Sequence, residues 1–346
     1  MDQNESARGM VFPAWVHRET NDGSDAGLTT LAEDALPAGD VLVRVAYSSI
    51  NYKDALALTP GGGGVLRKLP MVPGIDLSGV VARSGDPRFR EGDRVLATGY
   101  DLGTAHYGGF AAYCRLPADW LVPLPDGLSL REAMGIGTAG FTAALAIERL
   151  EQAGLRPDSG DVLVTGATGG VGSFAVALLA ERGYTVVAMS GKPAAHPYLR
   201  QLGAARIVGR AEPAADGGAK RKPLERQLWA GAVDSVGGGT LAGILAATKY
   251  GGSVAACGLA GGAELQTTVL PFILRGVNLL GIDSVYCPKA VRERLWGKLG
   301  GEWKPQRLGA IVSGEVPLAE AADASARLLQ GEATGRTVVR VGGDAE

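Results

Sequence analysis

The sequence has few of the residues that hold metals and disulfides. Its 346 residues include three cysteines and three histidines, all widely separated along the chain. The cysteines, Cys114, Cys257 and Cys287, form no C-x-x-C pair and have no histidine nearby in sequence. A catalytic zinc needs about three converging protein ligands, and a disulfide framework needs a regular cysteine pattern. The sequence therefore predicts neither a metal centre nor disulfides.

Charge of one sign and long apolar runs are also lacking. The formal net charge is −2, and no block of Lys or Arg provides the electrostatic footprint of a nucleic-acid or membrane-surface protein. No stretch approaches the roughly 18 consecutive apolar residues of a membrane span. The first residues, MDQNESARGMVFPAWVHRE, are polar rather than basic and then apolar. We therefore expect a cytoplasmic protein that binds neither nucleic acid nor membranes.

Glycine is abundant, with 53 residues, and one glycine-rich stretch has a specific context. TGATGGVG, at 165–172, lies between the apolar run DVLV and the helix-like run SFAVALLAERG. A helix that starts after such a turn points unpaired amide N–H groups and the positive end of its dipole at an anion. The spacing is G-x-x-G-x-x-G, and an ordinary tight turn is the competing interpretation. A second apolar run, GYTVVAMS, completes a βαβ unit and favours a dinucleotide site.

The secondary-structure signals in the sequence change along the chain. Residues from about 40 to 125 contain short β-like runs separated by Gly, Pro and Asp, which predicts a small, mostly antiparallel domain. From Asp161 onward, strand and helix signals alternate, which predicts an α/β fold with a doubly wound parallel sheet. The closing run GRTVVRV reads as a strand that returns to the first domain.

The end of the second predicted strand of the βαβ unit indicates the cofactor. An NAD-binding unit carries an acidic residue about twenty positions beyond the glycine turn, where it binds the adenosine ribose. Here the residues are Ser190, Gly191 and Lys192, which suit a 2′-phosphate and include no carboxylate to repel it. The sequence therefore favours NADPH over NADH, the alternative being that Lys192 is a solvated loop residue.

Segments spread over nearly the whole chain match a known family: SSINYKDALA, PMVPGIDLSGVV, DPRFREGDRVLATG, GIGTAGFTA, VTGATGGVGSFAVALLA, SGK, AACGLAGG, PFILRGVNLLGIDSV and GRTVV. In these segments the chain resembles the zinc-free branch of the medium-chain dehydrogenase/reductase superfamily. Within that branch it is similar to the quinone oxidoreductase group and to its acryloyl-CoA reductase (NADPH) type. Zinc-dependent relatives have Gly-His-Glu where this chain has Pro73-Gly74-Ile75-Asp76. Two positions depart from the family pattern: the glycine-dense loop TPGGGGV, and Gly331 where several relatives have Asn.

The resemblance implies a Rossmann domain over 136–304, inserted in a GroES-like, mostly antiparallel β domain formed by 1–135 and 305–346. It also implies a homodimer. The residues that it assigns to the NADPH site are Tyr52, Thr168, Gly169, Gly170, Val171, Ser190, Gly191, Lys192, Arg206, Leu259, Ile273 and Ser284.

The implied reaction is reduction of an activated C=C, with hydride added to the β-carbon and a proton to the α-carbon. Negative charge then develops on the thioester oxygen, where positioned donors lower the barrier. We expect Tyr52 to donate there or to neighbour the nicotinamide, Asn51 to orient the substrate, and Asp54 and Asp76 to position the network or relay a proton. For both aspartates, loop capping or a structural ion pair is the alternative.

The resemblance implies that the substrate is an acyl-CoA or a small enone. Acryloyl-CoA is the leading prediction, with Arg67 and Lys68 either meeting the CoA phosphates or standing as plain surface charges. A quinone or enone reductase is the first alternative. A protein that binds NADPH as a sensor or structural subunit without catalysis is the second.

Overall fold

The computed structural model describes residues 10–209 and 222–342, and it divides into two compact units. Of the described residues, the first unit contains 10–138, 285–301 and 312–342. The second contains 139–209, 222–284 and 302–311. The helix α2, Leu130–Gln152, runs from the first unit into the second, with a break at Gly137, where φ is 49°. Over the described ranges, none of the helices is both long and apolar enough to cross a membrane.

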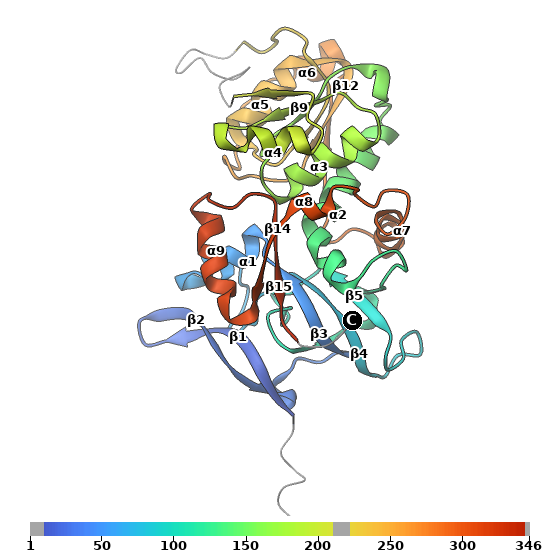
Figure 1. Ribbon diagram of the computed structural model, residues 1–346. Helices are drawn as coiled ribbons and strands as arrows, with labels where there is room; N and C mark the ends of the chain where they lie inside the picture. The colour runs from blue at the N-terminus through green and yellow to red at the C-terminus, as the bar shows by residue number, and fades with distance from the viewer. Residues whose placement is uncertain (1–9, 210–221, 343–346) are drawn as a thin grey trace, which may run out of the picture. The chain divides into compact units, whose positions relative to one another are not determined.

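The first unit contains a seven-stranded, mostly antiparallel sheet, of which β3, β4, β5, β14 and β15 are labelled in Figure 1. Its strand order is β14-β15-β3-β4-β5-β7, with β6 paired to β3, and β1 and β2 form a separate hairpin. The closing strand β15 pairs with β3, as the sequence predicts, so the end of the chain completes the domain that the N-terminal part begins. The elements are β1 Val11–Thr20, β2 Gly23–Ala32, β3 Val41–Ser49, α1 Tyr52–Ala57, β4 Asp76–Ser84, β5 Arg94–Thr98, β6 Tyr113–Leu116, β7 Leu121–Pro123, α7 Lys289–Leu299, β14 Val312–Pro317, α9 Ala321–Leu329 and β15 Arg336–Arg340.

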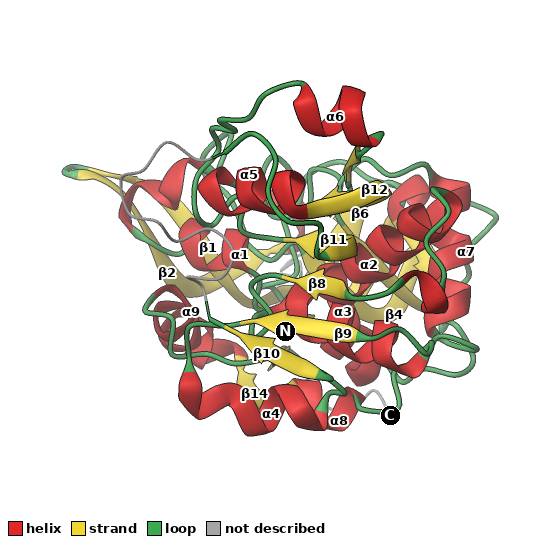
Figure 2. Cartoon of the chain, turned by 90° about the horizontal axis from the view of Figure 1, so that it is seen from above, coloured by secondary structure: helices red, strands yellow, loops and turns green. Residues whose placement is uncertain are grey.

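The second unit contains a six-stranded parallel sheet in the order β10-β9-β8-β11-β12-β13. Figure 2 shows β12, β11, β8, β9 and β10 following one another across it. The apolar runs VLV of β8 and VVAM of β9 are buried along their whole length, as expected for strands covered on both faces. The elements are β8 Val162–Val164, α3 Gly170–Glu181, β9 Val186–Met189, α4 His196–Gln201, β10 Arg206–Val208, β11 Trp229–Asp234, α5 Gly238–Ala247, β12 Thr248–Ala256, α6 Leu270–Arg275, β13 Asn278–Gly281 and α8 Leu308–Ile311.

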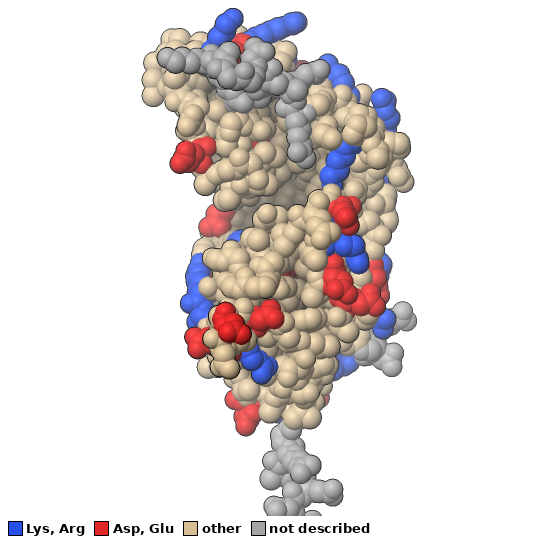
Figure 3. Space-filling view, turned by 90° about the vertical axis from the view of Figure 1, so that its left-hand side faces the viewer, with Lys and Arg blue, Asp and Glu red and all other residues tan. Residues whose placement is uncertain are grey.

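This topology confirms the predicted α/β fold with a doubly wound sheet. The strand order reverses between β8 and β11, and open parallel sheets bind ligands beyond the carboxyl ends of the strands at that reversal. The glycine turn follows β8 directly, so it lies at this edge. On the face shown in Figure 3, acidic and basic side chains are scattered among neutral ones, in line with the small net charge.

Candidate active site

The turn between β8 and α3 is shaped so that only glycine fits at its centre. Gly166 has a φ of 55°, a conformation that other residues rarely adopt. A Cβ on Gly172 would lie 2.2 Å from the carbonyl oxygen of Gly166, so the start of α3 packs directly on the turn. Gly169 precedes the first residue of the twelve-residue helix α3. The first N–H groups of such a helix have no partners within it, so the turn provides donors for an anion.

The loop after β9 lies at the same edge, because β8 and β9 are parallel neighbours. Ser190 is buried, and its hydroxyl oxygen accepts a hydrogen bond of 3.1 Å from the backbone N–H of Lys192. Gly191 is exposed and Lys192 is half-buried. The residues that the sequence predicts to bind the 2′-phosphate therefore follow β9 at the edge that carries the glycine turn.

Arg206 lies elsewhere. It begins β10, and its guanidinium forms an ion pair of 2.9 Å with Asp161, which directly precedes β8. Both residues stand at the amino ends of parallel strands, which is the edge opposite the glycine turn. This geometry lends no support to the prediction that Arg206 contacts the cofactor.

The other three residues predicted for this site in the second unit differ in exposure. Leu259, in the loop after β12, is 66% exposed, and Ile273, in α6, is 68% exposed. Exposed aliphatic side chains of this size are available to pack against a ligand or another protein surface. Ser284 is buried, and its hydroxyl oxygen accepts a hydrogen bond of 2.8 Å from the hydroxyl of Thr142.

In the first unit, the start of α1 is held by a buried polar cluster. Asn51 precedes the helix, and its backbone N–H donates a 2.8 Å hydrogen bond to Oδ2 of Asp54. The other carboxylate oxygen of Asp54 accepts the backbone N–H of Ile75, also at 2.8 Å. Tyr52, the first helical residue, is 56% exposed, whereas Asp54 is fully buried. This turn therefore presents the tyrosine to the outside, together with the exposed Lys53.

Asp76 is the second buried carboxylate of this cluster. It accepts hydrogen bonds from the hydroxyl of Ser49 at 2.7 Å, from the amide of Asn51 at 2.8 Å and from the backbone N–H of Thr138 at 2.9 Å. A Cβ on Gly137 would lie 2.6 Å from its Oδ2, which explains why α2 breaks at a glycine. Asp76 thus ties the start of α1 to the break in α2.

Arg336 supplies the positive charge, and sequence reasoning missed it. Its guanidinium is buried, lies 3.7 Å from Oδ2 of Asp76, and donates to the carbonyl of Ile50 at 2.9 Å, the side-chain oxygen of Asn51 at 3.0 Å and the hydroxyl of Ser49 at 2.8 Å. Burial lowers the pKa of Arg336, while the two aspartates raise it. The available signal was an arginine at the start of the apolar strand RTVV, because a buried charge requires a partner.

The cluster combines two carboxylates with one guanidinium. Burial, and next the charge of Asp76, raise the pKa of Asp54 to about 7, although its hydrogen bonds from Asn51 and Ile75 lower it. Each carboxylate is satisfied by internal donors and closed to solvent. The geometry therefore favours the alternative that the sequence left open for both aspartates, which is capping for Asp54 and a structural ion pair for Asp76.

The donor set does not fit zinc. Every cysteine and histidine of the sequence lies in the described ranges, and the described residues contain no group of three or more His, Cys, Asp or Glu suited to a metal ion. Asp76 is engaged by the cluster, and burial raises the pKa of the Cys114 thiol. Burial also raises the pKa of Cys257 to about 12, so this thiol stays protonated.

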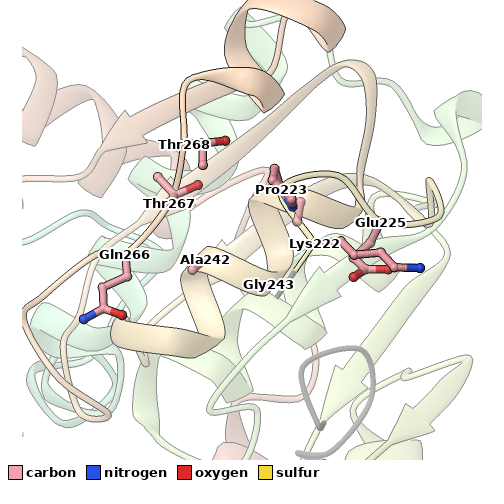
Figure 4. Close-up of a pocket in the computed structure, with 9 residues that line it drawn as sticks. Lys222, Pro223, Glu225, Ala242, Gly243, Gln266, Thr267 and Thr268 are labelled. Carbon is pink, nitrogen blue, oxygen red and sulfur yellow. The ribbon is translucent and has the colours of Figure 1, made fainter. Parts of the chain in front are cut away.

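A cavity of about 380 Å³ lies elsewhere in the second unit (Figure 4). It is bounded by α5 and by the segments 222–225 and 266–268. Lys222 and Glu225 lie on one side of α5 in this view, and Gln266 and Thr267 lie on the other. No residue predicted for the active site lines this cavity, so it is separate from the glycine turn.

The segment that forms the doubly wound sheet and its glycine turn is inserted in the sequence of a mostly antiparallel β domain. This combination defines the class of alcohol-dehydrogenase-like oxidoreductases. Two family models match the chain: "Alcohol dehydrogenase GroES-like domain" over residues 37–126, and "Zinc-binding dehydrogenase" over residues 170–297. The chain has the fold of the "Zinc-binding dehydrogenase" model, but its described residues do not form a set of zinc ligands.

Individual relatives match almost the whole chain. Putative quinone oxidoreductase YhfP of Bacillus subtilis is 51% identical over 96% of this chain and 99% of its own length, and its structure with NAD bound has a TM-score of 0.92. Probable acrylyl-CoA reductase AcuI of Escherichia coli is 51% identical over 93% of this chain and 98% of its own length. The yhdH oxidoreductase of Salmonella enterica, in complex with NADP, is 50% identical over 96% of this chain and 100% of that structure, with a TM-score of 0.91. The chain therefore belongs to the medium-chain dehydrogenase/reductase family, which confirms the resemblance seen in the sequence, and it is an oxidoreductase.

Proposed function

We propose that this oxidoreductase uses NADPH to reduce the activated C=C of acryloyl-CoA, giving propionyl-CoA. The observation that carries the proposal is the 51% identity with probable acrylyl-CoA reductase AcuI over nearly the full length of both chains. The glycine turn and the Ser190–Lys192 loop at one edge of the sheet supply the matching cofactor chemistry.

The cofactor residues divide by the part of NADPH that they suit. Thr168, Gly170 and Val171, at the start of α3, offer backbone donors to the pyrophosphate. The N–H of Gly169 donates to the carbonyl of Gly166 at 2.9 Å, so Gly169 contributes close approach of the backbone instead. Ser190, Gly191 and Lys192 offer a hydroxyl, room and a positive charge to the 2′-phosphate. We retain Leu259, Ile273, Ser284 and Tyr52 as further contacts, whereas the position of Arg206 favours a structural ion pair.

When bound, NADPH supplies a hydride to the β-carbon of the thioester. The hydroxyl of Tyr52 donates a hydrogen bond to the thioester oxygen, where negative charge develops in the transition state. Asn51, Asp54, Asp76 and Arg336 hold the turn that carries this tyrosine, so they set its position without leaving the protein interior. A fixed donor is effective because little reorganisation is needed during the reaction.

The CoA moiety carries phosphates, for which Arg67 and Lys68 are candidate partners. Both side chains are exposed. The Arg67 guanidinium is held by Asp101 at 3.0 Å and by the hydroxyl of Tyr286 at 3.1 Å, so it is fixed in one direction. If these side chains bind the CoA phosphates, Lys68→Ala is expected to raise the KM for acryloyl-CoA more than the KM for a small free enone, because the free enone has no phosphates.

Reduction of quinones or free enones is the second candidate function, favoured by the 51% identity with putative quinone oxidoreductase YhfP. Binding of NADPH without turnover is the third. The test follows NADPH absorbance with acryloyl-CoA, crotonyl-CoA, free acrylate and a quinone in parallel. Our proposal requires the highest kcat/KM with acryloyl-CoA. A quinone that surpasses both thioesters supports the second function, and binding with no oxidation by any substrate supports the third.

We further propose a cytoplasmic homodimer. The three cysteines are free, as expected in a reducing compartment. Strand β13 ends the second unit's sheet, and its Leu279 is 38% exposed. In α6, which precedes β13 in the sequence, Leu274 is 57% exposed. An exposed strand edge with apolar neighbours is suited to pairing with a second copy. Sedimentation at twice 35.5 kDa supports the dimer, and Leu279→Lys is expected to shift the protein to monomer.

A further inference from the structure

Asp234 is a buried carboxylate at the reversal of strand order in the second unit. It is the last residue of β11, the strand next to β8, and its side chain is 0% exposed. Burial raises its pKa, which its hydrogen bonds oppose. Among the described residues, no ion pair involves it. Burying a carboxylate costs free energy unless hydrogen bonds compensate for the lost water. The hydrogen bonds of Asp234 therefore indicate which parts of the structure it holds together.

The carboxylate joins two loops. Its Oδ1 accepts a hydrogen bond of 2.6 Å from the hydroxyl of Thr165, the residue that opens the glycine turn. Its Oδ2 accepts the backbone N–H of Gly237 at 2.8 Å, in the loop that leads into α5. The hydroxyl of Thr165 also accepts the backbone N–H of Ser235 at 3.1 Å. The turn after β8 is thus bonded to the loop after β11 by side chains as well as by the sheet.

A third loop interlocks with these two through close backbone contacts. The backbone carbonyl of Asp234 accepts the N–H of Cys257 at 2.8 Å. A Cβ on Gly258 would lie 2.4 Å from the carbonyl oxygen of Ser235, and one on Gly237 would lie 2.7 Å from that of Gly262. Since these loops approach too closely for any side chain, a shift in one must move the others.

We propose that Asp234 is a positioning residue for the dinucleotide site, which fixes the glycine turn by linking it through Thr165 to the loops after β11 and β12. The inference rests on the proposed dinucleotide site. Asp234 touches neither cofactor nor substrate in this account. It acts by holding the N–H donors of the turn in the arrangement that a pyrophosphate needs, which lowers the cost of ordering them on binding.

The test compares single variants by NADPH titration and by melting without cofactor. Asp234→Asn cannot accept from both Thr165 and Gly237, and Thr165→Val removes the hydroxyl at nearly constant shape. We expect each to raise the Kd for NADPH about tenfold or more, the scale of a lost hydrogen bond to a charged group. The Kd of the double variant for NADPH is expected to be no higher than that of the weaker-binding single variant, because both substitutions break the same link between Asp234 and Thr165.

Two controls separate positioning from general loss of stability. Thr165→Ser keeps the hydroxyl and is expected to keep the Kd within about twofold of wild type. Thr248→Val removes another buried hydroxyl of the same unit, which donates to the carbonyl of Ile244 at 2.7 Å. It is expected to lower the Tm while leaving the Kd unchanged.

Hydrogen exchange without cofactor tests the link itself. In Asp234→Asn or, should that variant not fold, in Thr165→Val, the amides of 166–172, 237–239 and 258–262 are expected to exchange faster together. Unchanged exchange in these three segments overturns the inference, as does a wild-type Kd in both variants. Wild-type protein that binds no NADPH contradicts the proposed function instead, and the exchange result then decides the positioning role.

Discussion

Asp54→Asn tests the charge balance of the buried cluster in the first unit. Burial and the charge of Asp76 raise the pKa of Asp54 from 3.8 to about 7 in the folded chain. An acid with a higher pKa in the folded state binds protons more tightly there, so its contribution to the free energy of unfolding falls as the pH rises from 3.8 to about 7. At ~1.4 kcal/mol per pH unit, the loss between pH 5 and 7 is about 2.5 kcal/mol, and asparagine removes this dependence.

The assay is the Tm of both proteins by calorimetry at pH 5, 6, 7 and 7.5. In a unit of this size, ~1 kcal/mol moves the Tm by about 2–4 °C, so the Tm of Asp54→Asn minus that of wild type should grow by about 5–10 °C across the range. Asp86→Asn is the control. Arg88 holds the pKa of Asp86 at about 2, so this carboxylate stays ionised throughout. A gap that stays constant for Asp54→Asn refutes the assignment of the titrating proton to Asp54.

The remaining predictions concern cofactor, catalysis and metal. Lys192→Ala should weaken NADPH binding by about 1.5–3 kcal/mol and scarcely affect NADH, because only NADPH carries the 2′-phosphate; titration of both cofactors checks this, and equal losses argue against the contact. Tyr52→Phe should lower kcat and kcat/KM together, since its hydroxyl acts in the transition state, and an unaltered rate removes Tyr52 from the chemistry. Arg336→Met should destabilise the first unit by about 3–5 kcal/mol in chemical denaturation, because it leaves buried carboxylates unpaired; a change below ~1 kcal/mol contradicts the ion pair. Exhaustive chelation should leave the rate unchanged, and stoichiometric zinc in the purified protein would overturn the zinc-free account.

Most of the fold was predictable because hydrophobic periodicity and turn residues indicate where the strands and helices lie. The runs DVLV and YTVVAM mark β8 and β9, and the helix-like run SFAVALLAERG marks α3, Gly170–Glu181. The hairpin β1–β2 was not predicted, because strands such as GSDAGLTTLA are largely exposed and lack a buried apolar face. The domain boundaries stay a prediction, although residues 285–301 cluster with the first unit rather than with the Rossmann sheet.

The candidate site was predictable where a local motif determines geometry. The glycine turn and Ser190–Lys192 follow adjacent parallel strands, so sequence spacing places them at one edge. The roles of Arg336 and Asp234 depend on contacts over 285 and 69 positions of sequence, which no local pattern reveals. Arg206 illustrates the reverse, because the resemblance assigns it to the cofactor site, whereas its place at the start of β10 puts it at the opposite edge of the sheet.

The most direct test of the proposed reaction is the fate of the transferred hydride. With NADPH deuterated on the transferred face, reduction of acryloyl-CoA should place one deuterium on the terminal carbon of propionyl-CoA, and reaction in heavy water should label the adjacent carbon instead. Mass spectrometry and NMR of the product distinguish the two positions. If labelled NADPH yields no deuterated thioester while a quinone consumes it readily, the acryloyl-CoA assignment is contradicted and the quinone reductase function takes its place.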